Sequence, residues 1–280
     1  MLNVIKNLFG GLINWKMKKL VSVTIPTFNS EKTLEKTLEK VKTQTYENIE
    51  IIIIDSYSDD KTLEIAKKFN AKVIMCKGKL LKARILGAEK SKGEYILLLD
   101  SDQILEKTAI KRAVKKMKDY DYLWFYERSY NKEKFLPSLY DADRILVQKY
   151  LDEGVVLPRF FKRNLLLKAF SNIPKEHISI CSAQDHIITS YEVEKISKKM
   201  GEVENAVWHI EPDSLIKLFR KQYRWGKTTR DFYERKVYRK LITKKDKFRK
   251  FRFDEPMLSV KSFLLRILRG IPYKLGFWFG

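Results

Sequence analysis

Short, nearly continuous apolar runs alternate with amphipathic segments along the amino-terminal part of the chain. The runs occupy residues 20–26, 49–56, 71–75 and 94–100. They are rich in β-branched residues, as strands are, and strands that are apolar at almost every position belong to sheets covered on both faces. The pattern therefore predicts a central sheet with helices packed on each side.

The segments between these runs have the spacing of helices. Leu34, Leu38 and Val41 recur on one helical face, and Ser30 precedes them as a candidate N-cap. Further helical patterns follow over residues 59–70 and 80–93. Strand–helix repeats of this kind predict an α/β fold with a mostly parallel sheet. Ligands of such folds bind beyond the carboxyl ends of the strands.

Beyond residue 105 the pattern is weaker. We expect helices over 106–119 and 185–193, strands over 120–130 and 206–212, and a short strand leading into a helix over 158–170. The stretches 128–160 and 171–184 contain no motif and are interpreted as loops that set specificity. Three regions result: an amphipathic segment (1–19), an α/β domain (20–212) and a basic, mainly helical extension (213–280).

The end of this extension has a helical pattern of its own. Ser262, Arg266 and Arg269 fall on one stripe, and the other stripe consists largely of Leu264, Leu265, Leu268 and Ile271, followed by Trp278 and Phe279. This favours an interfacial helix on an anionic membrane surface. A helix docked on the domain or on a partner is the alternative.

The formal net charge of +22 indicates a polyanionic partner: nucleic acid, anionic lipid head groups or a phosphorylated substrate. No run reaches the roughly 18 apolar residues of a membrane span, and no secretory signal is recognisable. We therefore expect a cytoplasmic protein, peripheral on the inner face of the cell membrane. The distant cysteines Cys76 and Cys181 are expected to be small, buried hydrophobic residues outside any disulfide framework.

Polar residues stand where three of the predicted strands end. They are Thr27 and Asn29, Asp55 and Ser56, and Asp100 and Asp102. An Asp-Xaa-Asp triplet by itself is common in turns. Its carboxylates are also hard oxygen ligands, which suit Mg²⁺ or Mn²⁺ bound together with substrate phosphates. Such a cation would stabilise a diphosphate leaving group as its charge grows.

Four motifs succeed one another along this pattern: "VSVTIPTFNSEKTLEKTLE", "IEIIIIDSYSDDKT", "KARILGAEKSKGEYILLLDSD" and "AQDH". Because these motifs occur in this order, the chain resembles the family-2 glycosyltransferases with the nucleotide-sugar-binding GT-A fold, over roughly residues 20–210. The resemblance implies a Rossmann-like domain with helices on both faces of the sheet. It also implies a nucleotide-diphosphate sugar as donor and Mg²⁺ or Mn²⁺ as cofactor.

The resemblance assigns positions to the nucleotide. The turn that contains Pro26, Thr27 and Asn29 looks like the family's turn beside the nucleotide. Asp55 looks like the aspartate that hydrogen-bonds the base or ribose. Ser56 stands where the family often has a second acid, so this contact differs here.

Further positions come from the third helix and the fourth strand. Lys82 and Arg84 look like the basic positions that face the nucleotide. In the Asp-Ser-Asp triplet, Asp100 is similar to the acid on the ribose side and Asp102 to the main metal ligand. Ser101, between them, is included among the donor-binding residues.

Later positions concern the acceptor and the metal. Asp185 matches the acid of the family's Glu-Asp pair, the catalytic base of inverting members, and Gln184 replaces the glutamate. His209 follows a late strand, where several relatives place a histidine near the metal or diphosphate. "KQYRW" resembles a Gln-Xaa-Xaa-Arg-Trp motif, in which Arg224 meets a phosphate and Trp225 stacks on a sugar. Each of these residues has a purely structural alternative. Asp185 can be an ordinary acid at a helix N-terminus, His209 a partly buried histidine, and Trp225 a core residue beside a solvated Arg224.

These assignments predict a metal-dependent, inverting glycosyltransferase. The basic and apolar carboxyl end favours a lipid-linked or cell-surface glycan, a saccharide in either case, as the acceptor. A catalytically silent, membrane-bound scaffold is one alternative, which Gln184 and Ser56 favour. A nucleic-acid-binding protein is the other; it leaves the acids at the strand ends unexplained, so no nucleic-acid partner is expected.

Overall fold

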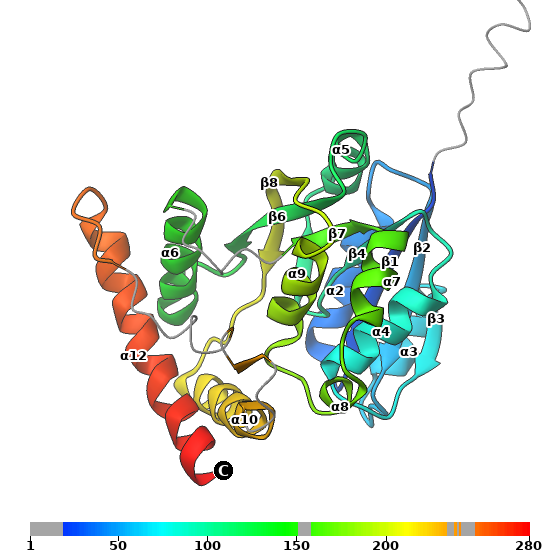
Figure 1. Cartoon of the computed structure of the whole chain (residues 1–280). Helices are drawn as coiled ribbons and strands as arrows, with labels where there is room; N and C mark the ends of the chain where they lie inside the picture. The colour runs from blue at the N-terminus through cyan, green and yellow to red at the C-terminus, as the bar shows by residue number, and fades with distance from the viewer. Residues whose placement is uncertain (1–18, 151–157, 234–237, 240, 242–249) are drawn as a thin grey trace, which may run out of the picture.

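A mixed sheet forms the centre of the computed structural model, which describes residues 19–150, 158–233, 238, 239, 241 and 250–280 (Figure 1). The predicted amino-terminal segment, 1–19, lies almost wholly outside the described residues. The strands are β1 (Val21–Thr27), β2 (Ile49–Asp55), β3 (Lys72–Met75), β4 (Tyr95–Leu98), β5 (Gln103–Leu105), β6 (Tyr122–Ser129), β7 (Pro158–Lys162) and β8 (Met200–His209).

The first half of the sheet is the predicted parallel α/β unit. The strand order is β3-β2-β1-β4-β7-β6-β8-β5, and β1 pairs in parallel with both β2 and β4. The register places Thr27 opposite Asp55 at the carboxyl ends of β1 and β2. Asp100 follows β4 at the same edge, so the polar residues that end three separate apolar runs are brought together here.

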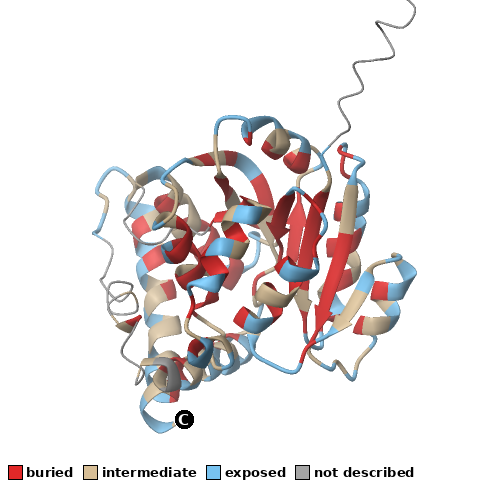
Figure 2. Cartoon of the chain, turned by 45° about the vertical axis from the view of Figure 1, so that its right-hand side comes forward, coloured by how far each residue is buried: buried red, intermediate tan, exposed pale blue. Residues whose placement is uncertain are grey.

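Helices cover both faces of this sheet, as the apolar runs predict. They are α2 (Glu31–Lys42), α3 (Thr62–Lys68), α4 (Leu80–Lys90), α5 (Ala109–Lys116), α7 (Arg163–Ser171), α8 (Lys175–Ile178) and α9 (Asp185–Glu194). Helices α2, α3 and α5 share one core with alternate strand residues such as Val23 and Ile53. Helices α4, α7 and α9 share cores with the opposite residues, such as Ile52 and Ile96. Figure 2 shows the central strands buried along most of their length.

The second half of the sheet is more mixed than predicted. β7 pairs antiparallel with β4 and β6, and β8 pairs in parallel with β6 and antiparallel with β5. The short strand β5 was missed, and β8 starts at Met200 although only 206–212 was predicted. The early residues of β8 were missed because Gly, Glu and Asn interrupt the apolar pattern there.

A long helix, α6 (Phe135–Tyr150), occupies much of the stretch interpreted as a loop over 128–160. Its buried residues include Leu136, Leu139, Leu146 and Val147, which have helical spacing. Pro137 lies in the first turn, where proline is tolerated because those N–H groups have no intrahelical partner. The periodicity could therefore have identified this helix.

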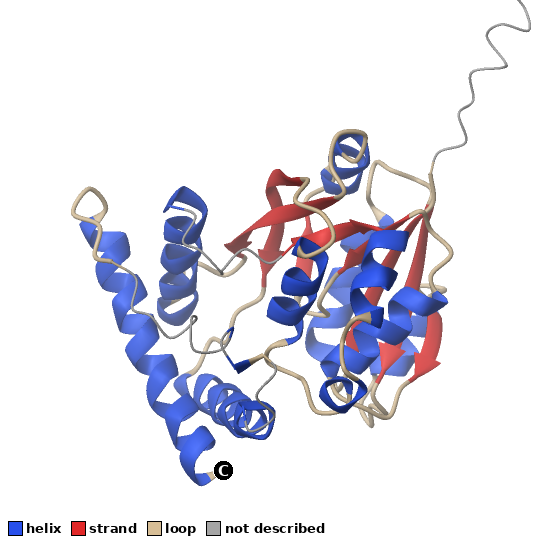
Figure 3. Ribbon diagram, viewed as in Figure 1, coloured by secondary structure: helices blue, strands red, loops and turns tan. Residues whose placement is uncertain are grey.

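Two long helices form most of the described part of the carboxyl-terminal extension: α10 (Leu215–Tyr233) and α12 (Pro256–Phe279). They pack on each other and, through Leu218 and Leu265, on α6. Figure 3 shows this helical group beside the sheet rather than on one of its faces. The extension is helical, as the composition predicts.

The orientation of α12 differs from the sequence interpretation. Leu265 is fully buried, and Leu264 and Leu268 pack on the same cluster, so the predicted leucine stripe faces the protein. It turns inward because α6 and α10 offer an apolar surface there. Ile271 and Trp278 of the predicted apolar set face outward instead. They belong to an outward apolar stripe whose members are each at least 38% exposed: Val260, Phe263, Ile267, Ile271, Leu275 and Trp278.

The two cysteines agree with expectation. Cys76 and Cys181 are both buried and free. Among the described helices, none is long and apolar enough to cross a bilayer.

Candidate active site

The turn after β1 meets the turn after β2. Asp55 is fully buried and accepts hydrogen bonds from the hydroxyls of Thr27 and Ser58, both at 2.7 Å, and from the backbone N–H of Ser58 at 2.8 Å. Asn29 has a positive φ of 49° and accepts a hydrogen bond from the backbone N–H of Asp59. The turn chosen from the sequence is therefore a hydrogen-bonded platform at the strand ends.

Arg84 is the centre of the next cluster. Its guanidinium is fully buried; Nε donates to Oδ2 of Asp185 and Nη2 donates to Oδ1 of Asp100, both at 2.5 Å. The structure thus joins residues from α4, from the start of α9 and from the end of β4. Burial disfavours the charged forms, but the ion pairs outweigh it: they raise the pKa of Arg84 and hold the pKa of Asp100 well below its usual range.

His186 belongs to this cluster although no role was assigned to it from the sequence. Its Nε2 lies 2.8 Å from Nη2 of Arg84. Because a guanidinium has only donors, Nε2 accepts this bond and the imidazole proton is assigned to Nδ1. Burial lowers the pKa of His186, which favours this neutral form. The available signal was its position directly after Asp185 at the start of a helix.

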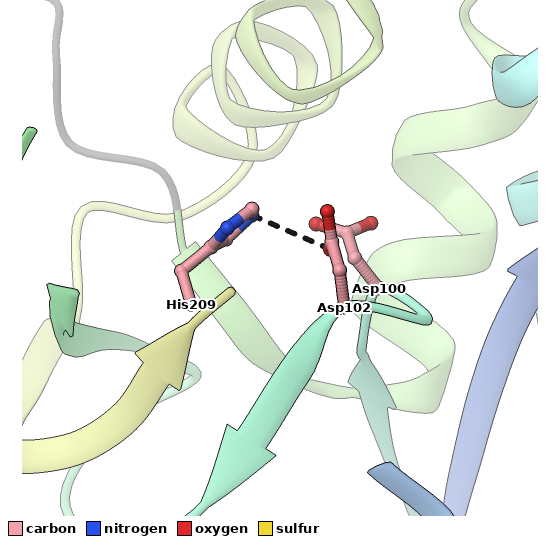
Figure 4. Close-up of side chains that lie close together, drawn as sticks. All are labelled: Asp100, Asp102 and His209. Carbon is pink, nitrogen blue, oxygen red and sulfur yellow. Dashed lines mark ion pairs between the residues drawn. The ribbon is translucent and has the colours of Figure 1, made fainter. Parts of the chain in front are cut away.

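Asp100, Asp102 and His209 converge beyond the ends of β4 and β8 (Figure 4). One candidate ligand atom from each lies within 4.8 Å of the others, and Nε2 of His209 is 3.4 Å from Oδ1 of Asp102. Both Asp100 oxygens accept from arginines, Arg84 and Arg159. Asp102 and His209 therefore present the more available donors, and two carboxylates with one imidazole fit Mg²⁺ or Mn²⁺.

A chain of buried ion pairs lies behind this cluster, and no sequence motif indicated it. Arg159 on β7 pairs with Asp100 at 3.1 Å and with Glu127 on β6 at 2.5 Å. Glu127 also accepts from Arg144 on α6 at 2.5 Å, and Arg144 pairs in turn with Glu211, just after β8. Oε1 of Glu211 lies 3.5 Å from Nδ1 of His209.

These pairs control the ionisation of their members. Burial opposes the ionised form of Glu127, but Arg159 and Arg144 outweigh it and lower its pKa to about 2. Burial likewise opposes the charge of Arg144, whereas Glu211 and Glu127 raise its pKa. The members were missed because Glu127, Arg144 and Arg159 lie on different elements, which only the sheet order brings together.

Three other chosen residues lie at the edge of these clusters. Lys82 is exposed, and its Nζ donates to the backbone carbonyl of Lys77. The Ser101 hydroxyl lies 3.0 Å from that of Ser30, the residue before α2, which links the triplet turn to the turn after β1. The Ser56 backbone N–H donates to the carbonyl of Thr27.

The residues chosen for the acceptor side are more dispersed. Gln184 is buried, and its Nε2 donates to the hydroxyl of Thr229 on α10 at 3.0 Å. Arg224 and Trp225 lie on α10 as well, and the Nζ atom of Lys221 lies over the face of the Trp225 ring, 5.1 Å from its centroid. In the described part of the chain, no hydrogen bond or ion pair connects Arg224 or Trp225 to the Asp102 cluster.

The chain matches proteins of one family in sequence. The model of "Glycosyl transferase family 2" matches residues 22–182. Glycosyltransferase GlyG of Streptococcus pneumoniae is 35% identical over 112 residues, which cover 38% of this chain and 37% of GlyG. The Escherichia coli UDP-Glc:alpha-D-GlcNAc-diphosphoundecaprenol beta-1,3-glucosyltransferase WfaP is 35% identical over 123 residues, 42% of this chain and 49% of WfaP. The matched stretches thus span less than half of these relatives.

Solved structures share the fold. Staphylococcus aureus TarS residues 1–349, in complex with UDP-GlcNAc, superposes with a TM-score of 0.53 and 15% identity, over 92% of this chain and 90% of that one. Mycobacterium tuberculosis glucosyl-3-phosphoglycerate synthase, in complex with Mn²⁺, UDP and its product, gives a TM-score of 0.54 and 18% identity, over 84% and 83%. The family match over more than half of the residues, on this fold, shows that the chain belongs to glycosyl transferase family 2.

Proposed function

We propose that this protein transfers a sugar from a nucleotide-diphosphate sugar to an acceptor hydroxyl, with inversion at the anomeric carbon. One observation supports this most strongly: Asp102 and His209, suited to a divalent cation, lie beside the buried Arg84–Asp185 pair at the carboxyl ends of the strands. The candidate metal ligands, which would hold the diphosphate through the cation, thus lie next to the carboxylate that would accept the proton of the acceptor hydroxyl. Inversion itself is inferred from the family resemblance.

The donor would lie across the strand ends. In this proposal the nucleoside contacts the turn that contains Thr27, Asn29 and Asp55, and the diphosphate lies over Asp102. When bound, Mg²⁺ or Mn²⁺ would neutralise the charge that the diphosphate gains as it leaves. The structures of the TarS complex with UDP-GlcNAc and of the synthase with Mn²⁺ and UDP support a UDP-sugar and a divalent cation by analogy of fold.

Asp185 would act as the general base. Arg84 holds Oδ2 of Asp185, which orients the carboxylate so that Oδ1 can meet the acceptor hydroxyl. The acceptor oxygen attacks the anomeric carbon as the bond from that carbon to the diphosphate breaks. The bond's electron pair leaves with the diphosphate oxygen, and the hydroxyl proton passes to Asp185.

The acceptor class is proposed from relatives and from the carboxyl-terminal helices. WfaP is named for a sugar acceptor on diphosphoundecaprenol, and TarP of Staphylococcus aureus, 38% identical over 104 residues, is named for poly(ribitol-phosphate). Both names give an acceptor that carries phosphate, and that of WfaP is linked to a lipid. The signal within this chain itself is the basic, apolar carboxyl end, which favours a lipid-linked or cell-surface glycan. We propose an acceptor of this class here.

The outward stripe of α12 supports a peripheral contact with an anionic membrane. Apolar residues such as Ile267 and Ile271 face away from the protein. The helix contains four basic residues and no acid. Helix α10, packed against it, adds exposed Arg220 and Arg224. A bilayer with anionic head groups satisfies both the apolar stripe and the surrounding charge, and it would place the site near a lipid-linked acceptor at the inner face of the membrane.

A panel of nucleotide sugars tests the enzyme. Thermal stabilisation and hydrolysis are measured with and without Mn²⁺, and transfer is then measured with undecaprenyl-diphosphate sugars as acceptors. We expect one donor to stabilise the protein only when Mn²⁺ is present and to be turned over. Donor binding without any turnover would instead support a catalytically silent scaffold, and no donor binding would contradict the proposal.

A further inference from the structure

The ion pairs behind the metal cluster form a closed circuit. The circuit starts at Asp100 and continues in the order Arg159, Glu127, Arg144, Glu211 and His209. It closes because His209 faces Asp102, which lies two residues after Asp100 in the chain. The two sides of the metal cluster are thus connected twice: once through the cluster itself and once through this circuit. Glu127 is its midpoint, because each of its two oxygens accepts from a different arginine.

We infer that Glu127 is a positioning residue, which sets the separation between the carboxylates after β4 and the imidazole at the end of β8. This inference rests on the proposed function, because it concerns the metal that the function requires. Arg159 connects Glu127 to Asp100, and Arg144 connects it to Glu211. The Glu211 carboxylate faces Nδ1 of His209, so that Nε2 is turned toward Asp102.

Gln103 connects Glu127 to the triplet by a second route. Its side-chain oxygen accepts from the backbone N–H of Asp100 at 2.9 Å, and its Nε2 donates to Oε1 of Glu127 at 3.3 Å. Gln103 is fully buried and directly follows Asp102. Glu127 therefore restrains the backbone of the triplet turn as well as the carboxylate of Asp100.

The charges of these residues fit a single divalent cation. The carboxylates are Asp100, Asp102, Glu127, Asp185 and Glu211, and the guanidinium groups are Arg84, Arg144 and Arg159. With neutral imidazoles, five acids against three arginines leave a formal charge of minus two. A divalent cation balances this charge, whereas loss of Glu127 halves the formal negative charge that attracts the cation.

Electron paramagnetic resonance with Mn²⁺ as the probe tests the inference on the full chain. The signal of free Mn²⁺ gives the Kd, and pulsed measurements report ¹⁴N coupling from a bound histidine. We expect Glu127→Gln to weaken Mn²⁺ binding about 10- to 100-fold, as loss of outer-shell partners does, and to reduce the ¹⁴N coupling. Asp102→Ala provides the reference for loss of a ligand.

Two further variants make the result specific. Glu127→Asp keeps the charge but is too short to reach both arginines, so the protein should fold and still bind Mn²⁺ more weakly. Asp121→Asn is the matched control: it removes a carboxylate paired with Lys162 just before the opposite end of β6. We expect its Mn²⁺ affinity to equal that of the wild type.

The outcomes separate this inference from the proposed function. If folded Glu127→Gln and Glu127→Asp bind Mn²⁺ within twofold of the wild type, or if Asp121→Asn weakens binding equally, Glu127 is not a positioning residue. If the wild-type chain binds no Mn²⁺ even with UDP, the inference and the metal requirement both fail. The transfer assay still decides whether the protein is a glycosyltransferase.

Discussion

Nε of Arg84 donates to Oδ2 of Asp185 at 2.5 Å, although the two residues are 101 positions apart in the chain. The same guanidinium binds Asp100 through Nη2. One buried side chain thus connects the proposed base to the acid that begins the triplet. It also explains how the buried carboxylate of Asp185 and the partly buried carboxylate of Asp100 can lie close together, since both are paired with this guanidinium.

Replacing Arg84 by methionine should destabilise the protein strongly. The change leaves the buried carboxylate of Asp185 without its cation, and loss of one partner of a buried pair costs about 3–5 kcal/mol. Urea unfolding measures this. Arg112→Met is the control, because its ion pair with Glu106 is half-exposed and such pairs contribute about 1 kcal/mol or less. Equal losses in the two variants would show that Arg84 has no special structural role.

Asp185→Asn should reduce kcat about 10²- to 10⁴-fold, because the amide cannot accept the acceptor's proton. The amide oxygen can still accept from Arg84, so the pocket should keep its shape. Donor affinity, measured by calorimetry with a non-hydrolysable UDP-sugar, should be unchanged. Retention of substantial turnover would remove Asp185 from the role of base, and loss of donor binding would indicate a positioning role instead.

The depressed pKa of Glu127 predicts a specific dependence of stability on pH. The pKa lies at about 2 in the folded protein against an ordinary value of 4.5. Glu127 therefore contributes stability above pH 4.5, and this contribution is lost as the pH falls toward 2. Between pH 7 and pH 3, the difference in unfolding free energy between wild type and Glu127→Gln should narrow by roughly 2 kcal/mol.

Urea unfolding in the presence of EDTA measures this difference without a contribution from bound metal. A gap between wild type and Glu127→Gln that stays constant from pH 7 to pH 3 would contradict the ion-pair assignment.

Glycines allow α10 and α12 to cross with their backbones in contact. A Cβ at Gly276 would lie 2.0 Å from the carbonyl oxygen of Tyr223, and one at Gly226 would lie 2.0 Å from that of Tyr273. Gly276→Ala should therefore destabilise the protein by about 1–3 kcal/mol or separate the helices. Gly270→Ala, in the same helix with no atom within 4 Å of its Cβ, should stabilise it by about 1 kcal/mol.

Differential scanning fluorimetry distinguishes the predicted loss of stability from the predicted gain. The melting temperature should fall for Gly276→Ala and rise for Gly270→Ala. A rise for both would mean that the two helices do not cross at these glycines in solution.

The outward stripe of α12 predicts binding to anionic vesicles. Ile267→Ser combined with Ile271→Ser should weaken binding to phosphatidylglycerol vesicles by about tenfold or more. Full burial of one isoleucine side chain is favourable by about 1.5–3 kcal/mol, so even partial burial of both in the interface is sufficient for this loss. Flotation assays measure this, and binding should decrease with added salt. Met75→Ser, an exposed apolar position on β3, is the control. Unchanged flotation of the double variant would contradict a membrane-facing stripe.

Much of the fold could be predicted from sequence because its signals are local. The apolar runs of β1, β2 and β4 and the spacing of Leu34, Leu38 and Val41 depend only on neighbouring residues, and the structure confirms them. The placement of Asp100 and Asp102 after β4 could also be predicted, since a strand of a parallel sheet places the residues after its carboxyl end at the edge where ligands of such folds bind.

Tertiary structure decided the features that depend on contacts between distant elements. Glu127, Arg144, Arg159 and Glu211 have no motif, and they meet only because β7 and β6 are inserted between β4 and β8. The inward turn of Leu265 likewise depends on α6, a helix far earlier in the chain. The sequence by itself determined which strands are buried and where they end. Only the packed structure decided which charges share one low-dielectric site, because that choice depends on burial and distance rather than on order along the chain.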